Sequence, residues 1–259
     1  MHIKKKSLGI VVQARTGSTR LPNKVVLNFY NEHSILDLIL NRFGDEDLIT
    51  YPKILATSTA DADRVLESYA LSHGFKFFCG SENDVLKRFI DVGETYGITH
   101  LVRVCADNPF INLVSVKTLI DYLTASDEDI DYLSFENSKG LPTIKTHLGI
   151  FAEIVSLDAL RKVNDSTVDS LYHEHVTNYI YEHKNDFRVV LIPAPDSVYY
   201  REDIRLTIDN KEDFELMANL YAKTIPISAD IDRLITFIDV DEENDYKKIM
   251  IDNINKYTK

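Results

Sequence analysis

The chain has 259 residues, of which 44% are hydrophobic and 27% are charged, so it is long enough and apolar enough to bury a sizeable core. Its 29 lysines and arginines are outnumbered by 41 aspartates and glutamates, which gives a formal net charge of −12 at pH 7. Such an acidic surface repels nucleic-acid phosphates and argues against a polynucleotide partner. A small polyphosphate stays compatible, because a local group of cations acts within a screening length of about 8–10 Å whatever the total charge.

The two cysteines, Cys79 and Cys105, each lie in an apolar, strand-like context. That placement favours buried thiols in a reducing compartment over a disulfide framework or a zinc site. The apolar run after residues 4–6 is interrupted by Gln13 and Arg15, which makes it too short for the core of a signal peptide, and no run of 18 apolar residues occurs. We therefore expect a cytoplasmic protein without membrane insertion.

In the first half of the sequence, apolar strands alternate with helix-length segments, which is the pattern of β-α-β units in a mostly parallel sheet. The expected strands are 8–12, 53–57, 75–79 and 101–105. The expected helices are 34–43, 62–73 and 84–96. Ser34 is suited to be an N-cap, and Gly44 and Gly74 are suited to end the first two helices.

The second half of the sequence is less regular. Strands are expected at 131–135, 148–155 and 187–192, a turn at 140–142, and helices at 171–183, 210–221 and 242–254. No internal repeat, low-complexity tract or Pro/Gly-rich linker divides the chain. We therefore expect a single α/β domain over residues 1–259, with a Rossmann-like, mostly parallel mixed sheet flanked by helices and a sheet-extension lobe for acceptor binding or dimerisation around residues 135–200.

The segment 9–24, GIVVQARTGSTRLPNK, runs a buried strand directly into a turn rich in cations, hydroxyls and backbone donors. Arg15, Arg20 and Lys24 can direct positive charge to one spot, and the Gly-Ser-Thr triplet between them offers N–H and hydroxyl donors. The spacing matches neither GxxxxGK[ST] nor GxGxxG. Any one of these residues alone would be an ordinary turn former or a solvated charge, but together they predict a polyphosphate-binding loop.

Residues 13–24 are similar to QARxGSTRLPxK, the signature of cytidylyltransferases that activate sugars and sugar acids. The family includes the CMP-ulosonate and CMP-sialate synthetases, and the spore-coat-polysaccharide type resembles this chain most closely. The resemblance is also strong at 80–89, 103–109 and 205–214 and covers almost the whole chain. It implies a nucleotide-diphosphosugar transferase fold, Mg²⁺ as cofactor, CTP as nucleotide, a sugar, sugar acid or phosphorylated relative as acceptor, pyrophosphate as product, and a homodimer.

The resemblance places nucleotide contacts in the loop and in two later segments. The expected nucleotide-binding residues are Gln13, Ala14, Arg15, Thr16, Gly17, Ser18, Arg20, Lys24, Ser81, Arg88 and Arg103, and Arg15 and Lys24 are also expected in catalysis. Gln13 is a candidate contact for the base or the ribose. Arg88 lies in GSENDVLKRF, similar to the family's GSExDVLxRF, and contacts with the base, a phosphate or an acidic neighbour all stay open for it. Arg103 can either reach the cleft or pair with a carboxylate.

Nucleotidyl transfer needs the developing pyrophosphate charge to be neutralised, and carboxylate-bound Mg²⁺ normally contributes to this. Asp107 follows a strand in VRVCADNPF, which is similar to the family's xDxP metal motif. Asp209 lies in RLTIDNKEDF, similar to the late motif RLTxDxxEDL, whose first aspartate completes the metal site. An N-cap role remains the alternative for Asp209. Asp107 and Asp209 are thus the expected metal ligands and catalytic residues, whereas Asp213 is expected to serve the helix N-terminus.

A third group of residues is expected on the acceptor side. On a helix, His173 and His175 would point about 200° apart, so they would not share one metal ion. The string HEHVT instead resembles the family's EHVTxYI element, which lies near the acceptor site or the dimer contact. Glu153 aligns with the family's GLDxE strand, although Phe151 stands where an acidic residue is usual. The expected acceptor-binding residues are Glu153, Glu174, His175 and Thr177.

Two other functions compete with this reading. A glycosyltransferase of related fold would use a nucleotide sugar and usually carries a DxD metal motif, and residues 129–131 have that spacing within an acidic run typical of a solvated loop. A non-catalytic nucleotide-binding protein would not need Lys24, Asp107 and Asp209 together. The sequence therefore favours a magnesium-dependent cytidylyltransferase that moves CMP to a sugar-type acceptor, but it does not identify the acceptor or prove CTP over UTP.

Overall fold

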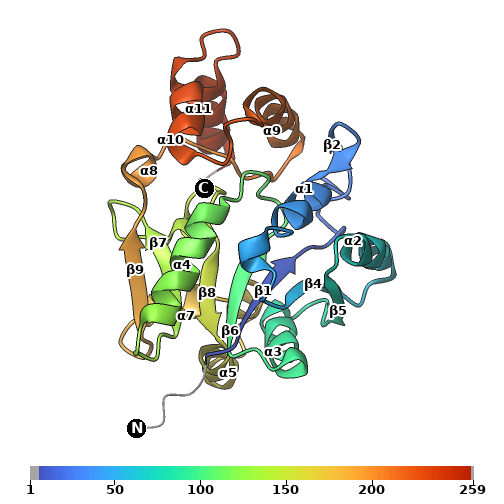
Figure 1. The fold of residues 1–259 in the computed structure, drawn as a ribbon, viewed down its shortest axis with the longest axis vertical. Coiled ribbons are helices and arrows are strands. Elements are labelled where there is room, and N and C mark those ends of the chain that lie inside the picture. Colours follow the sequence, from blue (N-terminus) through green and yellow to red (C-terminus); the bar gives the residue numbers. More distant parts are fainter. Residues whose placement is uncertain (1–5, 258–259) are drawn as a thin grey trace.

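The computed structural model describes residues 6–257, and its centre is a seven-stranded sheet with the order β5-β4-β1-β6-β8-β7-β9 (Figure 1). The strands are β1 (Leu8–Gln13), β4 (Lys53–Ser58), β5 (Lys76–Gly80), β6 (His100–Cys105), β7 (Tyr132–Glu136), β8 (Glu153–Ser156) and β9 (Val189–Pro193). β5, β4, β1 and β6 are parallel, β8 runs antiparallel to both of its neighbours, and β9 pairs parallel with β7. The predicted mostly parallel mixed sheet is confirmed.

The remaining elements surround this sheet. A short hairpin consists of β2 (Asn28–Tyr30) and β3 (His33–Ser34). The helices are α1 (Ile35–Arg42), α2 (Leu66–Ser72), α3 (Val85–Tyr96), α4 (Leu113–Ala125), α5 (Leu157–Ser166), α6 (Ser170–Glu174), α7 (Asn178–Glu182), α8 (Asp196–Tyr199), α9 (Lys211–Thr224), α10 (Ile231–Val240) and α11 (Tyr246–Tyr257). Short 3₁₀ turns occupy Glu46–Leu48, Asp61–Val65 and Thr143–Lys145. In Figure 1, α9, α10 and α11 gather at the top of the molecule.

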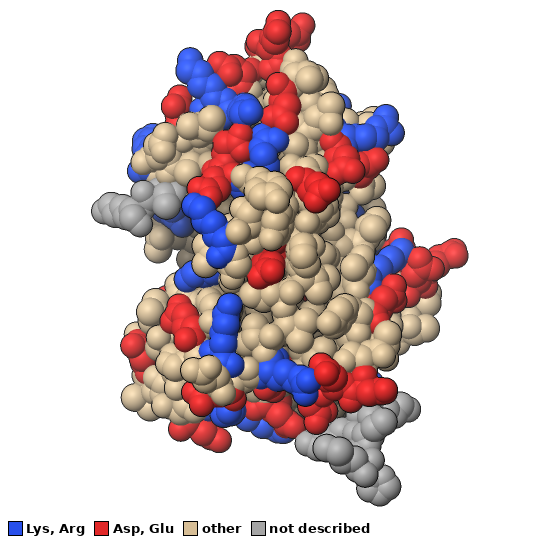
Figure 2. Space-filling view, turned by 90° about the vertical axis from the view of Figure 1, so that its left-hand side faces the viewer, with Lys and Arg blue, Asp and Glu red and all other residues tan. Residues whose placement is uncertain are grey.

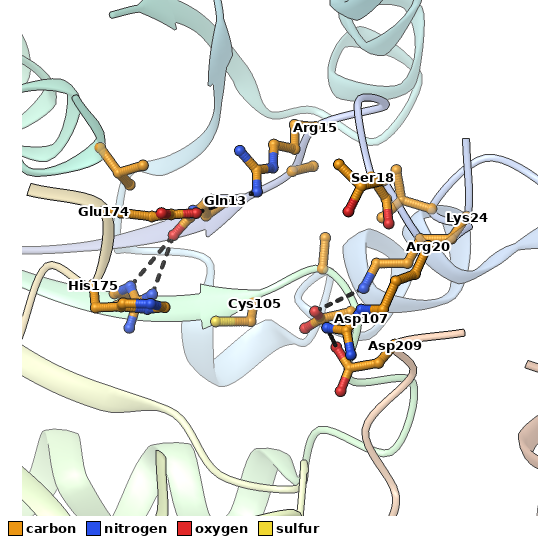
Figure 3. A pocket seen from close by; sticks show the side chains of 16 residues that line it. Gln13, Arg15, Ser18, Arg20, Lys24, Cys105, Asp107, Glu174, His175 and Asp209 are labelled. Carbon is orange, nitrogen blue, oxygen red and sulfur yellow. Dashed lines mark hydrogen bonds and ion pairs between the residues drawn. The ribbon is translucent and has the colours of Figure 1, made fainter. Parts of the chain in front are cut away.

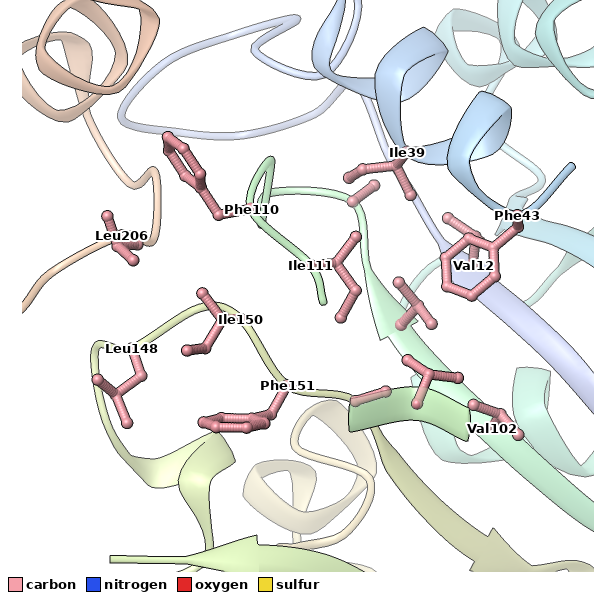
Figure 4. Close-up of a cluster of buried hydrophobic side chains, with 14 of the residues drawn as sticks. Val12, Ile39, Phe43, Val102, Phe110, Ile111, Leu148, Ile150, Phe151 and Leu206 are labelled. Atoms are coloured by element: carbon pink, nitrogen blue, oxygen red, sulfur yellow. The ribbon is translucent and has the colours of Figure 1, made fainter. Parts of the chain in front are cut away.

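Helices cover both faces of the sheet. This is seen at β1, whose consecutive residues belong to different hydrophobic clusters. Val12 packs in a cluster with α1, α2 and α4, part of which Figure 4 shows, whereas Val11 packs with α3, α5 and α7. Successive side chains of a strand point to opposite faces, so a strand that is buried on both sides must be apolar throughout. This explains why 8–12 reads as a continuous apolar run.

Two predicted elements differ in the structure. The strand predicted at 148–155 begins only at Glu153, and residues 148–152 are buried but irregular (Figure 4). Gly149 has φ +59°, and a Cβ there would lie 3.0 Å from the carbonyl carbon of Leu206, so this segment bends around a neighbouring chain instead of extending the sheet. The helix predicted at 171–183 is wrong as a single unit, because the chain leaves α6 at His175 and resumes as α7.

Other predicted boundaries shift less, and some elements were not predicted at all. The helix expected at 62–73 begins with a 3₁₀ turn and becomes α-helical only at Leu66. The sequence reading omitted α4, α5 and α10, although each has an N-cap whose side chain accepts a hydrogen bond from the third helical residue: Asn112, Ser156 and Asp230. These caps were therefore a usable signal.

The surface carries charges of both signs. Figure 2 shows the face that lies on the left of Figure 1, where acidic and basic side chains are interspersed around a central area that is mostly uncharged. Over residues 6–257, no helix is long and apolar enough to cross a membrane.

Candidate active site

A pocket of about 320 Å³ opens at the carboxyl ends of β1 and β6, which are neighbours in the middle of the sheet. Ligands of open α/β sheets bind in this position. The predicted site residues that line it are Gln13, Ala14, Arg15, Ser18, Arg20, Lys24, Arg103, Asp107, Glu174, His175 and Asp209. The fold thus brings residues from four distant parts of the chain, 13–24, 103–107, 174–175 and 209, into one pocket.

One end of the pocket combines cations with carboxylates (Figure 3). Lys24 Nζ lies 3.0 Å from Asp107 Oδ2 and donates to the carbonyl oxygen of Ile208 at 2.6 Å. Arg20 Nη2 lies 2.9 Å from Asp209 Oδ1. The two aspartates therefore face the loop cations directly, and Lys24 joins the loop after β1 to the segment before α9.

Arg205, a residue that the sequence analysis did not single out, positions Asp209 through a hydrogen bond. The Arg205 guanidinium donates two hydrogen bonds to Asp213, at 2.8 and 2.7 Å, and one to Asp209 Oδ2 at 2.9 Å. Asn210, not Asp209, is the N-cap of α9 and accepts from the Asp213 N–H at 2.8 Å. Asp213 serves the helix start as predicted, because it accepts from the Asp209 N–H at 3.0 Å, but it also anchors Arg205.

The donor chemistry of this end fits a magnesium ion that is shared with a phosphate. Asp107 and Asp209 keep 34% and 30% of their side-chain surface exposed toward the pocket that both line. Mg²⁺ is commonly held by one or two carboxylates together with substrate phosphates. Within the described part of the chain, no group of three or more His, Cys, Asp or Glu side chains is arranged to hold a metal alone.

The loop after β1 is tied down by Asp63, which the sequence reading missed. Both the backbone N–H and the hydroxyl of Thr16 donate to Asp63 Oδ1, each at 2.7 Å. Burial alone would raise the pKa of Asp63, but hydrogen bonds from Ser58 and Thr16 outweigh it and hold the pKa below its usual range. The Thr16 side chain is thus turned away from the pocket. At the next residue, Gly17, an added Cβ would meet no atom within 4 Å, so the space beside this turn is empty.

Beneath the other end of the pocket lies a buried network around Glu153. The Glu153 carboxylate, 1% exposed, accepts from Arg103, from the Tyr132 hydroxyl and, at 3.0 Å, from the Thr177 hydroxyl. Arg103 also donates to Gln13 Oε1 at 3.3 Å. Arg103 therefore both reaches the cleft and pairs with a carboxylate, the two alternatives left open for it. Glu153 does not line the pocket but positions Arg103 from below.

The segment after β5 approaches the pocket only at Val85. Arg88 is 1% exposed and donates to the carbonyl oxygens of Ser81 and Glu82, so it organises this turn from within. Burial lowers the pKa of Arg88. The structure thus does not bring Ser81 and Arg88 into the pocket lining, because β5 is the edge strand and lies two strands away from β1.

A second compartment of about 630 Å³ adjoins the first. The two share Arg103, Cys105, Asp107, His175 and Asp209 as a common wall. Residues found only in the second compartment include Asn108, Thr143, Lys145, Thr146, His147, Phe151, Thr177, Asn178, Tyr181 and Thr207. Most of them come from irregular segments, for which sequence periodicity gives no signal.

Two polar atoms of the second compartment lack a partner. Asn108 is 5% exposed, and neither its Oδ1 nor the Thr207 Oγ1 forms a hydrogen bond with any residue of the described chain. Buried polar atoms are normally paired, so these two exceptions in residues of the compartment wall are notable. Asn108 adjoins Asp107 in the sequence, so the motif itself could have drawn attention to it.

Cys105 lies in the wall between the compartments, yet it is poorly suited to be a nucleophile. Burial raises the pKa of its thiol to about 11, so the thiolate is scarce near neutral pH.

Comparison with known proteins agrees with this geometry. Residues 9–243 match the family model described as cytidylyltransferase. An uncharacterized protein of Methanocaldococcus jannaschii is 35% identical over 250 residues, which are 96% of this chain and 94% of that protein. The spore coat polysaccharide biosynthesis protein SpsF of Bacillus subtilis is 34% identical over 219 residues, covering 82% of this chain and 85% of that protein.

Among solved structures, a cytidylyltransferase from Leptospira borgpetersenii superposes with a TM-score of 0.80 and is 27% identical, covering 95% of this chain and 97% of that one. The match of the family model spans nearly all of the sheet and includes the loop cations and both pocket aspartates. The chain therefore belongs to the cytidylyltransferase family and is a nucleotidyltransferase.

Proposed function

We propose that this enzyme transfers CMP from CTP to an anionic, sugar-type acceptor and releases pyrophosphate. The observation that carries the proposal is the meeting of the loop cations with Asp107 and Asp209 at the carboxyl ends of β1 and β6. Fixed cations stabilise a triphosphate and the charge that develops on its leaving pyrophosphate. Carboxylates beside them would be out of place in a simple anion site but suit a metal-bound nucleotide.

On the nucleotide side, Arg15, Arg20 and Lys24 would bind the phosphates. In the free protein these cations are paired with Glu174, Asp209 and Asp107, respectively, so phosphate binding requires an exchange of partners. We further propose that Asp107 and Asp209 hold Mg²⁺, which would screen the negative charge of the phosphate oxygens.

On the acceptor side, the second compartment offers both charge and hydrogen-bonding groups. Arg103 and Lys145 supply positive charge for a carboxylate or phosphate of the acceptor. Asn108 Oδ1 and Thr207 Oγ1 are unpaired and buried at its wall, and rotation of these side chains would allow them to accept hydrogen bonds from sugar hydroxyls. Because the compartments share a wall, an acceptor oxygen bound in the second can meet the α-phosphorus of a nucleotide bound in the first, without a protein nucleophile.

No observation favours the glycosyltransferase alternative. Asp131 precedes β7, and β7 runs in the same direction as β6, so it lies at the opposite edge of the sheet from the pocket. Its carboxylate accepts from the Ser156 hydroxyl at 3.2 Å and from the Arg188 N–H at 2.9 Å, which is a structural role at the strand ends.

The test is pyrophosphate release from CTP, UTP, ATP and GTP with Mg²⁺, across a panel of sugar acids and sugar phosphates, with the CMP-linked product identified by mass spectrometry. We expect turnover with CTP that is lost in Asp209→Asn and kept in Asp131→Asn. Turnover of a nucleotide sugar, or activity that survives in Asp209→Asn but not in Asp131→Asn, would overturn the proposal. The homodimer remains a prediction that sedimentation equilibrium can test.

A further inference from the structure

Helix α6 supplies part of the active-site wall although none of its residues is buried. Glu174 at its end lines the nucleotide pocket, and the following His175 lines both compartments. The apolar residues Val168 and Leu171 beside and within α6 are 95% and 50% exposed. A five-residue helix is not stable by itself, and its main apolar contacts are the edge-on packing of Tyr172 on Tyr179 and the burial of Val176 just after it, so polar contacts also help to hold α6 in place.

The main polar contact is made by His173, whose two ring nitrogens both face hydrogen-bond acceptors. Nδ1 lies 2.8 Å from Asp84 Oδ2, and Nε2 lies 3.0 Å from the carbonyl oxygen of Thr167. Asp84 is the N-cap of α3, and its other oxygen accepts from the Lys87 N–H at 2.8 Å. A neutral imidazole has only one N–H, so only the imidazolium can donate to both acceptors.

We infer that protonated His173 is a positioning residue, which fastens α6 to the N-terminus of α3 and thereby holds Glu174 and His175 in the active-site wall. The inference rests on the proposed function only for the choice of CTP as the ligand. Its link to the nucleotide is the ion pair between Glu174 Oε1 and Arg15 Nη2, 3.7 Å apart, which joins α6 to the phosphate-binding loop. Release of α6 would remove the carboxylate that holds the Arg15 side chain in place beside the pocket, before phosphate takes its place.

The charges around His173 set the direction of its pH dependence. His173 lies near two carboxylates: Asp84 at the start of α3 and Asp169 at the start of α6. The buried Arg88 of α3 lies near Asp84 in turn. The hydrogen bond to the Thr167 carbonyl and the contact with Asp84 outweigh burial and raise the pKa of His173 above its usual value. The fastening is therefore complete below pH 6.5 and is lost as the pH rises through this raised pKa.

The first test uses the protein without ligand. In ¹⁵N-detected NMR, with the signal assigned by its absence in His173→Gln, both imidazole nitrogens should be protonated at pH 6.5. The protection factors of residues 167–177, which remove the intrinsic pH dependence of exchange, should fall as His173 deprotonates. A neutral imidazole at that pH, or exchange in this segment that is the same in His173→Gln and wild type, would overturn the inference. These readouts do not depend on which nucleotide the enzyme uses.

The second test is calorimetric titration of CTP from pH 6 to 9 into wild type, His173→Gln, His173→Arg and the control His73→Gln. His73 also lies between a carbonyl oxygen, that of Tyr69 at 2.9 Å, and a carboxylate, Asp37 at 3.8 Å, but outside both compartments. Titration of the nucleotide's own phosphate affects all four proteins alike and cancels in the comparison.

We expect wild-type and His73→Gln affinities to fall several-fold as His173 deprotonates. His173→Gln should be weak at every pH and lack this step. His173→Arg, a permanent double donor, should regain affinity and keep it at high pH. If His173→Gln binds CTP with the wild-type affinity and the wild-type pH profile, His173 has no positioning role.

Discussion

Replacement of Asp213 by asparagine should destabilise the fold strongly, although the sequence alone suggests a mild helix-end effect. Asp213 and Arg205 form an ion pair in which both side chains are 2% exposed, with two short hydrogen bonds, and Asp213 also accepts from the Asp209 N–H. Removal of one partner of such a buried pair leaves an uncompensated charge and costs about 3–5 kcal/mol. Because Asp209 still contacts Arg205, we expect the lower end of that range.

A loss of about 3 kcal/mol should lower the unfolding temperature by roughly 6–12 °C for a chain of this size. Urea unfolding followed by circular dichroism measures the free energy, and pyrophosphate release measures the accompanying loss of Asp209 positioning. The control is Glu212→Gln on the same helical turn, where the exposed side chain pairs with Lys256 and accepts from the Tyr257 hydroxyl. Equal unfolding midpoints for Asp213→Asn and wild type would refute the argument that this buried pair holds the site together.

Three further predictions concern the pocket. Arg15→Ala should weaken CTP binding by about 1.5–3 kcal/mol without changing the unfolding temperature. Lys24→Ala should weaken CTP binding equally and also lower the unfolding temperature, because Lys24 joins two segments of the chain. Titration calorimetry and thermal unfolding of both variants check this. Asp107→Asn and Asp209→Asn should abolish Mg²⁺-dependent turnover without stabilising the free protein, because cations already neutralise both carboxylates; a raised unfolding temperature would contradict this. Asn108→Ala should raise the acceptor KM about tenfold or less and leave the CTP KM unchanged. Steady-state kinetics with both substrates varied measure the two constants, and a change in the CTP KM instead would contradict the assignment of Asn108 to the acceptor.

Structural features that depend only on residues close together in the sequence could be predicted. The apolar run of β1 and the loop that follows it needed only local information, and Asp107 was identified because it comes directly after a strand. The helix caps that were overlooked are also local. Chain direction in the sheet then explains why Asp107 and the loop meet, since β1 and β6 are parallel neighbours.

Features that depend on tertiary contacts could not be predicted. Asp63 anchors Thr16 across 47 residues, and Arg20 reaches Asp209 across 189, so no spacing rule connects either pair. Glu153 was expected to touch the acceptor because its motif aligned, but alignment does not reveal that β8 turns its side chain into the sheet's buried layer beneath Arg103. The break between α6 and α7 was missed because apolar spacing across residues 171–180 continues through it.

The shared wall between the two compartments has a consequence for how such an enzyme can diversify. Residues in the wall line both compartments, so under the proposed function a change there would alter the binding of nucleotide and acceptor together. Thr143, Lys145 and Thr146, in contrast, line only the second compartment and lie in the irregular segment between β7 and β8, where substitutions leave the sheet pairing intact. A lineage could therefore exchange one acceptor for another by altering this segment while its phosphate-handling groups stay fixed.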